Sequence, residues 1–295
     1  MEALAGMSET PQHWAEHKER GNFWLMKLTA FGVKVLGRRL LAPVLYAIVL
    51  YFFVFGRKAR RSIWHYQQHL ADWSGQPALR PTPWRGFGQF MAFADALLDK
   101  LDVWNGRLKT QDIEIIDPAR LREQMRAERG QMLVGAHLGN LEVCRALAEL
   151  GEKIPLNVLV HTRHAEHFNR LLGEAGATHV RLIQVSELNP GVMLQLSQRL
   201  ENGEWLAIAG DRVPLHGART ALVNFLGHPA PFPQGPWLLA GLLKCPVNLL
   251  FCLKHQGRYR VVIEPFAEAI EWRRSDREQV IAEWAARYAE RLGHY

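Results

Sequence analysis

The chain has 295 residues, of which 48% are hydrophobic and 22% charged, a composition that can bury a sizeable core and excludes disorder over most of its length. Its formal net charge of +7 favours an anionic partner, such as a phospholipid surface, a nucleic acid or an acidic carrier protein. The three cysteines, Cys144, Cys245 and Cys252, lie in apolar contexts without a Cys-x-x-Cys pair, which predicts reduced, buried thiols.

The first predicted element is an apolar helix over residues 40–55. This run of sixteen residues carries no charge and is flanked by basic residues on both sides. It is shorter than the ~20 apolar residues of a straight membrane span, and Pro43 interrupts its early part. With a second apolar stretch over residues 23–36, it predicts a helical hairpin or a pair of interfacial helices. We expect an N-terminal helical membrane anchor that lies among the headgroups; a buried core helix of a soluble domain is the alternative.

Glycine and proline between Ser74 and Trp84 predict a boundary between a membrane-associated helical region over residues 1–80 and an α/β domain over residues 81–295. Beyond the boundary, apolar runs with strand and helix periodicity alternate. Strands are expected over residues 113–116, 132–136, 156–161, 180–185, 205–209, 221–225, 247–253 and 259–264, and helices over 118–129, 141–150, 166–174 and 191–201. This alternation predicts an α/β fold with a mixed, mostly parallel sheet flanked by helices. Sites in such sheets lie where strands end, and His137, Arg163 and Asp211 are all expected there.

His137 and Glu142 stand five residues apart, directly after the strand expected over residues 132–136. Five positions along one helix would turn the two side chains away from each other, so we place His137 on the turn after the strand and Glu142 in the next helix, with Asn140 as its N-cap. Glu142 then accepts a hydrogen bond from one ring nitrogen, while the other nitrogen removes a proton from an incoming alcohol. A turn histidine followed by an acid favoured at a helix N-terminus is the alternative.

Three histidines at intervals of three, His161, His164 and His167, raise the possibility of a zinc site. The first is expected at the end of a strand, so the three do not share a helix face and we predict no metal. The sequence also has no Gly-x-Ser-x-Gly elbow, Walker loop or Gly-x-Gly-x-x-Gly fingerprint. A serine hydrolase, an NTPase and a nicotinamide enzyme therefore lack support, and no cofactor is expected.

Two later segments are candidates for substrate binding. Asp211 and Arg212 follow the strand expected over residues 205–209 and precede a loop, where an acid can face the substrate rather than the core. Gly235 and Pro236 precede an apolar helix expected over residues 237–243. Free backbone N–H groups there can hold a phosphate or a thioester oxyanion, although the pair can equally be a helix start alone.

The segment His137-Leu138-Gly139-Asn140-Leu141-Glu142 in its strand-turn-helix setting, with residues 206–212 and Asn224-Phe225-Leu226-Gly227, resembles the lysophospholipid acyltransferase superfamily. Within it, the chain looks most like the late acyltransferases of lipid A biosynthesis, from about Trp14 to near the C-terminus. Members of the family often continue into an aromatic tail, so the resemblance implies a further segment beyond Tyr295.

The resemblance implies a glycerolipid acyltransferase-like fold and an enzyme that moves a fatty acyl chain from an acyl thioester to a lipid or glycolipid acceptor. The donor would be acyl carrier protein or acyl-CoA, and the acceptor group a hydroxyl or an amine. His137 and Glu142 would be the His-x4-Glu pair that acts as general base. Membership would also place the protein at the cytoplasmic face of the bacterial inner membrane.

Within the resemblance, Arg163 matches a block whose arginine helps hold the anionic part of a substrate, and a guanidinium suits a phosphate because it can bind two oxygens at once. Gly235 matches a Gly-Pro stretch beside the acyl-binding region. Asp211-Arg212 departs from the family, since lipid A enzymes tend to have Asp-Gln there and glycerolipid enzymes Glu-Gly-Thr-Arg. The added cation implies a different acceptor or a further phosphate contact.

A non-catalytic basic protein that binds a membrane surface or a nucleic acid is the alternative from another class. The basic residues of the chain concentrate near the apolar N-terminal run and are not interleaved with aromatic residues. That distribution favours lipid over nucleic acid, so no nucleic acid partner is expected.

Overall fold

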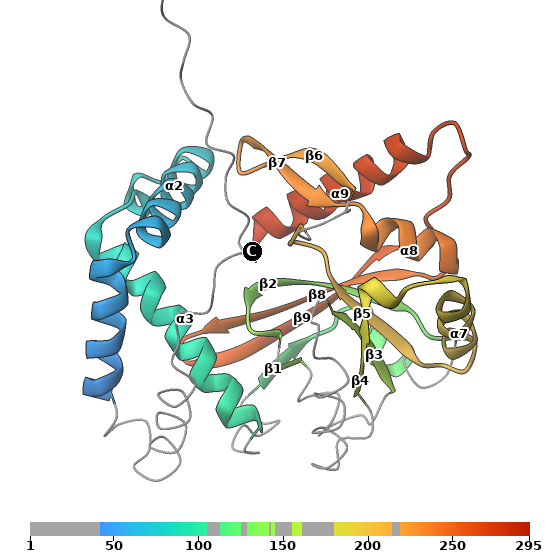
Figure 1. Cartoon of the computed structure of the whole chain (residues 1–295), viewed down its shortest axis with the longest axis horizontal. Coiled ribbons are helices and arrows are strands. Elements are labelled where there is room, and N and C mark those ends of the chain that lie inside the picture. The colour runs from blue at the N-terminus through green and yellow to red at the C-terminus, as the bar shows by residue number, and fades with distance from the viewer. Residues whose placement is uncertain are drawn as a thin grey trace, which may run out of the picture.

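The computed structural model describes residues 42–104, 113–124, 129–141, 143–144, 155–160, 180–213 and 219–295. In these residues a mixed sheet of seven strands lies beside an antiparallel hairpin, with helices packed around both (Figure 1). The sheet order is β1-β9-β8-β2-β5-β3-β4, and every neighbouring pair is parallel except β8 and β9. The predicted α/β class with a mostly parallel sheet is therefore confirmed.

The described strands follow the predicted order, and those over 113–116 and 205–209 are confirmed to the residue. The helices expected over 141–150 and 166–174 lie wholly or largely outside the described residues. The N-terminal helices are Ala42–Phe55, α2 (Arg57–Ser74) and α3 (Pro83–Trp104), with the short η2 (Pro77–Leu79) between the last two. The other helices are α4 (Leu121–Gln124), η5 (Val185–Glu187), α7 (Pro190–Glu201), α8 (Gly235–Leu243) and α9 (Arg277–His294). The strands are β1 (Ile113–Ile116), β2 (Met132–Gly139), β3 (Leu156–Val160), β4 (Val180–Gln184), β5 (Trp205–Ala209), β6 (Thr220–Phe225), β7 (His228–Pro233), β8 (Val247–His255) and β9 (Arg258–Ala267).

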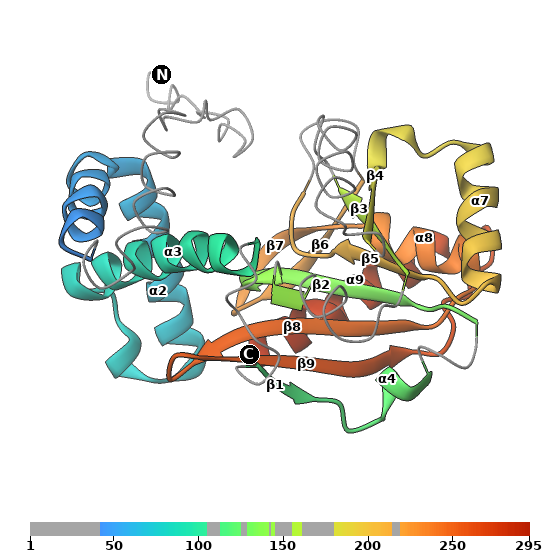
Figure 2. The same ribbon diagram turned by 90° about the horizontal axis from the view of Figure 1, so that it is seen from below.

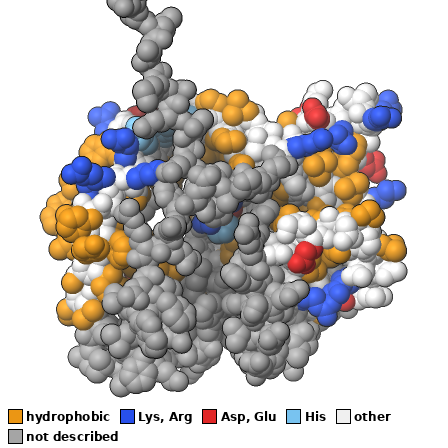
Figure 3. Space-filling model, viewed as in Figure 1, with side chains coloured by type: hydrophobic (Ala, Val, Ile, Leu, Met, Phe, Trp, Pro, Cys, Tyr) orange, Lys and Arg blue, Asp and Glu red, His pale blue; other side chains and the backbone are white. Residues whose placement is uncertain are grey.

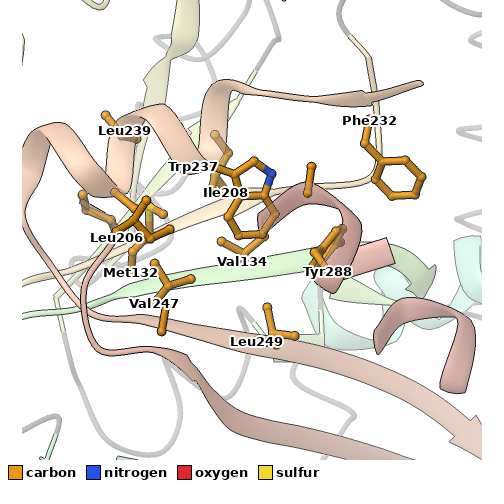
Figure 4. Packing of buried hydrophobic residues seen from close by; sticks show 14 of the residues in the cluster. Met132, Val134, Leu206, Ile208, Phe232, Trp237, Leu239, Val247, Leu249 and Tyr288 are labelled. Atoms are coloured by element: carbon orange, nitrogen blue, oxygen red, sulfur yellow. The ribbon is translucent and has the colours of Figure 1, made fainter. Parts of the chain in front are cut away.

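Residues 132–136, the first part of strand β2, are apolar without interruption because both faces of the sheet are covered. Met132 and Val134 face a large cluster that includes Trp237 of α8 and Tyr288 of α9 (Figure 4). Leu133, between them in the sequence, faces a second cluster on the opposite side. Parallel strands covered on both faces have such continuous apolar runs, and this burial holds β2 in the middle of the sheet.

The β6–β7 hairpin contains a strand that the sequence analysis missed. Strand β7 carries Pro229, Pro231 and Pro233, and proline usually argues against a strand because it has no N–H to donate. The amide of Gln234 donates to the carbonyl of Arg219, which places these opposed residues in a hydrogen-bonded pair. Counting in steps of two from that pair, the prolines fall on the non-bonded positions, where a missing N–H costs nothing.

The end of β2 differs from its prediction. The strand was expected to stop at Ala136 with His137 on the following turn, but it continues to Gly139, so His137 belongs to its last part. Pairing with β8 shifts register between Gly135 and Gly139, which marks an irregularity around His137. Gly139 has φ +81°, and its pairing partner is Cys252 of β8.

The N-terminal helices gather at one end of the sheet (Figure 2). Helix Ala42–Phe55 meets α2 at an angle of 87°, and its Phe53 packs edge-on against Phe87 and Phe90 of α3. Among the described helices, none alone is long and apolar enough to cross a membrane; Ala42–Phe55 and α2 together meet that length and composition in a sharply bent pair. The upstream apolar stretch over residues 23–36 lies outside the described residues.

The predicted boundary between Ser74 and Trp84 is a break between two helices. Helix α2 ends at Ser74 with Gly75 in the left-handed conformation, and α3 begins at Pro83. At this end α2 also contacts the hairpin, where the rings of His69 and His228 stack with their centroids 3.7 Å apart. The division into regions 1–80 and 81–295 stays a prediction.

Gly139→Ala should destabilise the protein strongly. A Cβ at this position would lie 1.8 Å from the carbonyl oxygen of Cys252, and the positive φ adds strain for any L side chain. We expect a loss of about 2–4 kcal/mol in the free energy of unfolding, measured by urea denaturation. Gly257→Ala is the matched control, because Gly257 has φ +79° but open space around its Cβ position. Equal losses in the two variants would contradict the steric argument.

Candidate active site

His137 and Asp211 lie at the same edge of the sheet because their strands are parallel neighbours. Gly135 of β2 is paired with Ala209 of β5, and His137 and Asp211 each follow two positions later. The carboxyl ends of parallel strands in an α/β sheet are where side chains meet a ligand. The expectation that both residues lie at strand ends is therefore confirmed for this pair.

The carboxylate of Asp211 holds His137 at two points. Its Oδ1 lies 2.8 Å from Nδ1 of the imidazole, and its Oδ2 accepts the main-chain N–H of His137 at 2.8 Å. The side chain of Asp211 is 17% exposed and that of His137 is 40% exposed. The acid is thus largely covered, while the imidazole that it holds reaches the surface.

This contact determines which ring nitrogen is available for chemistry. A carboxylate only accepts hydrogen bonds, so the hydrogen lies on Nδ1 and the lone pair lies on Nε2. An imidazole fixed in this tautomer by an acid can remove a proton from a hydroxyl or an amine through Nε2, and the acid stabilises the imidazolium that forms. The pair is therefore equipped for general-base catalysis.

Gly210 and Tyr288 fix the backbone of β2 two residues before His137. The N–H of Gly210 and the hydroxyl of Tyr288 both donate to the carbonyl oxygen of Gly135, each at 2.8 Å. A Cβ at Gly210 would lie 2.7 Å from Cγ1 of Val134 and 3.0 Å from Cζ of Tyr288. Glycine immediately before Asp211 therefore lets β5 approach close enough for the carboxylate to reach His137.

Tyr288 was not found by sequence reasoning. It lies on the apolar face of α9, is fully buried, and sequence spacing does not distinguish it from a core aromatic residue. Its pKa is raised well above the ordinary value, first by burial and then by the negative charge of Asp211. The hydroxyl therefore stays protonated and continues to donate to Gly135.

Tyr288 predicts a loss of stability at alkaline pH. Because its pKa is 10.0 in a model peptide and higher in the folded protein, the unfolded chain releases a proton above about pH 10 that the folded chain retains. The contribution is fully present below pH 10 and falls above it by about 1.4 kcal/mol per pH unit. Urea unfolding between about pH 9 and 11 should show a shallower decline for Tyr288→Phe than for the wild type. Identical slopes would contradict the assignment.

The remaining predicted site residues are only partly within the described structure. Arg212 is exposed beside Asp211, and Gly235 is exposed at the first position of α8, with Pro236 in its first turn. Glu142 and Arg163 lie outside the described residues, so their parts in the site stay predictions. Asp211 makes the contact with a ring nitrogen of His137 that was predicted for Glu142. Spacing along the chain cannot show this contact.

The histidines considered as zinc ligands, His161, His164 and His167, also lie outside the described residues. Within the part of the chain that the structure describes, no group of three His, Cys, Asp or Glu side chains is arranged to hold a metal.

Comparison with known proteins identifies the family of the chain. The family model for bacterial lipid A biosynthesis acyltransferases matches residues 15–292. No match was found among the curated proteins. The family match covers nearly the whole chain, including the N-terminal helices, β2, β5 and α9.

Proposed function

Because the chain belongs to the family of bacterial lipid A biosynthesis acyltransferases, we propose that it moves a fatty acyl group from an acyl thioester to a hydroxyl or amine of a lipid or glycolipid acceptor. The donor would be acyl carrier protein or acyl-CoA. The observation that carries the proposal is the two-point contact between Asp211 and His137, which leaves Nε2 of an exposed imidazole available as a base. Family membership supports an acyltransferase, and the contact supports the chemistry proposed for it.

In the proposed reaction, Nε2 of His137 removes the proton from the acceptor as its oxygen or nitrogen attacks the thioester carbonyl. The carbon–sulfur bond then breaks, and the imidazolium returns the proton to the leaving thiolate. Asp211 stabilises the imidazolium between these two steps. No acyl-enzyme forms, so both substrates are bound together and the kinetics are sequential.

Glu142 remains a second candidate for the acid that assists His137. The described geometry favours Asp211, since one carboxylate already binds both Nδ1 and the main-chain N–H of His137. We propose that Asp211 orients the imidazole and that Glu142, which the family resemblance pairs with His137, has a secondary part in the same site. The two assignments differ in which substitution, Asp211→Asn or Glu142→Gln, should lower the rate of transfer more.

His137→Ala should abolish transfer while leaving the fold intact, because the side chain is 40% exposed and its hydrogen-bond partner, Asp211, keeps its hydrogen bond to the main-chain N–H of residue 137. Asp211→Asn should lower the rate by on the order of 100- to 10,000-fold, since an amide no longer stabilises the imidazolium. Glu142→Gln should have the smaller effect if Asp211 is the orienting acid. Transfer is measured by mass spectrometry of lipids from cells that carry each variant or the wild type, because a missing acylated species identifies the acceptor and the acyl chain together.

Thermal melting of the same purified variants is the control for folding. An unchanged lipid profile with His137→Ala would refute its role as base. A larger loss with Glu142→Gln than with Asp211→Asn would transfer the orienting role to Glu142. If the wild type binds lipid but no lipid species depends on it, the non-catalytic membrane-surface protein becomes the better description.

Substrate binding is proposed for the residues around this pair. Arg163 and Arg212 would hold phosphates of the acceptor or the donor, and Asp211 would face the acceptor with its partly exposed side. Gly235 would let a substrate approach the first turn of α8, where a Cβ would meet nothing within 4 Å and backbone N–H groups are free of helix partners. Arg212 in place of the family's glutamine is the feature that separates this acceptor site from that of typical lipid A enzymes.

We further propose that the N-terminal helices anchor the protein to the cytoplasmic face of the bacterial inner membrane without crossing it. Of the 16 large hydrophobic side chains that are exposed in the described residues, 13 lie between Val44 and Leu97, and the other three are scattered over the α/β domain. Arg57, Lys58 and Arg61 are exposed on α2 beside them. Figure 3 shows hydrophobic side chains with basic ones above them along the edge formed by these helices. Such a surface suits an anionic bilayer.

Replacing Trp84 and Phe93 together by serine should weaken membrane binding. These α3 side chains are 83% and 67% exposed, so their removal takes apolar area from the proposed membrane surface with little cost to the fold. Flotation with vesicles that contain anionic lipid should recover less of this variant than of the wild type. The matched control replaces Leu222 and Leu194, which are 73% and 62% exposed on β6 and α7. Equal losses in both variants would contradict an anchor at the N-terminal helices.

A further inference from the structure

A chain of hydrogen bonds joins α3 to the segment that carries His137. Nζ of Lys254 lies 2.7 Å from Oδ2 of Asp99 in α3, and the hydroxyl of Tyr259 donates to the same oxygen. The side-chain amide nitrogen of Asn140 lies 3.4 Å from the Tyr259 hydroxyl and 3.1 Å from the carbonyl oxygen of Ala96. The roles are consistent along the chain: the ammonium and the amide nitrogen donate, the carboxylate accepts, and the hydroxyl does both.

Burial makes this chain energetically important. Asp99 is 4% exposed, Asn140 2% and Tyr259 4%. A buried carboxylate is costly unless it is paired and hydrogen-bonded, so the loss of one donor is not replaced by water. Burial and the hydrogen bond to Asp99 raise the pKa of Tyr259, which keeps its hydroxyl protonated as the link between Asp99 and Asn140.

The chain of hydrogen bonds ends at Asn140, three residues after His137, the proposed base. The main-chain N–H of Asn140 donates to the carbonyl oxygen of Cys252 at 2.9 Å, directly after Gly139 with its positive φ. The pairing of β2 with β8 is irregular from Gly135 to Gly139, so regular sheet pairing alone does not hold the backbone of His137. Asp211, which follows β5, contacts this stretch at His137. Asn140 fixes its other end through hydrogen bonds to residues of α3, β8 and β9.

We propose that Asp99, Tyr259 and Asn140 are positioning residues that hold the end of β2, and with it His137, against helix α3. The proposal rests on the proposed acyl transfer for its rate measurements and on the contacts alone for its structural measurement. It also connects the site to the membrane surface, because α3 carries the exposed Phe93 and Leu97 on the same helix as Ala96 and Asp99. Packing of α3 against the end of β2 and placement of His137 then depend on the same contacts.

Tyr259→Phe tests the proposal in the full-length protein. The change keeps the ring and removes the hydroxyl that joins Asp99 to Asn140. The matched control is Tyr295→Phe, which also removes a tyrosine hydroxyl that donates to a carboxylate, Glu264, at 3.0 Å but lies on the C-terminal side of α9. Lys254→Met is a milder second variant, because the Lys254 side chain is 33% exposed and its hydrogen bond is to Asp99, the end of the hydrogen-bond chain farther from Asn140. Its ammonium also lies over the Tyr259 ring, 5.5 Å from the centroid.

Two measurements are made on each variant. Turnover is followed with palmitoyl-acyl carrier protein and vesicles of total bacterial inner-membrane lipid, as release of the carrier thiol. Backbone order is followed by hydrogen–deuterium exchange of the peptide that covers residues 132–141. We expect Tyr259→Phe to lower kcat about tenfold or more, with KM for the carrier changed less than about twofold, and to speed exchange in this peptide. Lys254→Met should shift both in the same direction by less, and Tyr295→Phe should change neither.

Wild-type kcat and wild-type exchange in Tyr259→Phe would overturn the proposal. Equal effects of Tyr259→Phe and Tyr295→Phe would also overturn it, because they would show a general loss of stability rather than positioning. If the wild type consumes the thioester neither on acyl carrier protein nor on coenzyme A, the proposed function fails, and the exchange comparison still determines whether the hydrogen-bond chain orders the end of β2. If Tyr259→Phe does not fold, Lys254→Met provides the same comparison.

Discussion

The parallel pairing of β2 with β5 is the contact on which the rest of the site depends. The register from Met132 with Leu206 to Gly135 with Ala209 brings His137 and Asp211 to one edge, 74 residues apart in the sequence. Burial on both faces keeps β2 in this register, because a slip of one residue would exchange the side chains that face the two clusters. The carboxylate therefore meets the imidazole through packing of the core rather than through a loop.

Close backbone approach is the second constraint. Gly210 and Gly139 both occupy positions where a Cβ would overlap neighbouring atoms, one beside Val134 and Tyr288 and the other at the carbonyl of Cys252. At Gly210 the close approach is part of what lets Asp211 reach His137, and at Gly139 it lets the chain leave β2 toward Asn140. The base is thus held by backbone geometry as well as by its hydrogen bonds, an arrangement that suits a group that must stay in place while its charge changes.

The N-terminal helices give this site its surroundings. Apolar side chains exposed on Ala42–Phe55, α2 and α3 form the proposed membrane surface, and α3 also contributes Asp99 and Ala96 to the contacts that reach Asn140. An enzyme with a lipid acceptor would gain from this arrangement, because the helix proposed to meet the bilayer contacts Asn140, the residue directly after the strand that carries the proposed base. Membrane association and catalysis would then depend on the same helix.

The sequence by itself determined the α/β class, most strand positions, the family and His137 as the proposed base, because apolar periodicity and short motifs are local properties of the chain. It missed β7, whose prolines are acceptable only once the hairpin register is known, and it ended β2 before His137. Only the tertiary structure showed that Asp211 holds His137 and that Tyr288 lies beneath them. Those contacts join residues far apart in the chain, and their existence depends on strand order and register, which local spacing does not specify.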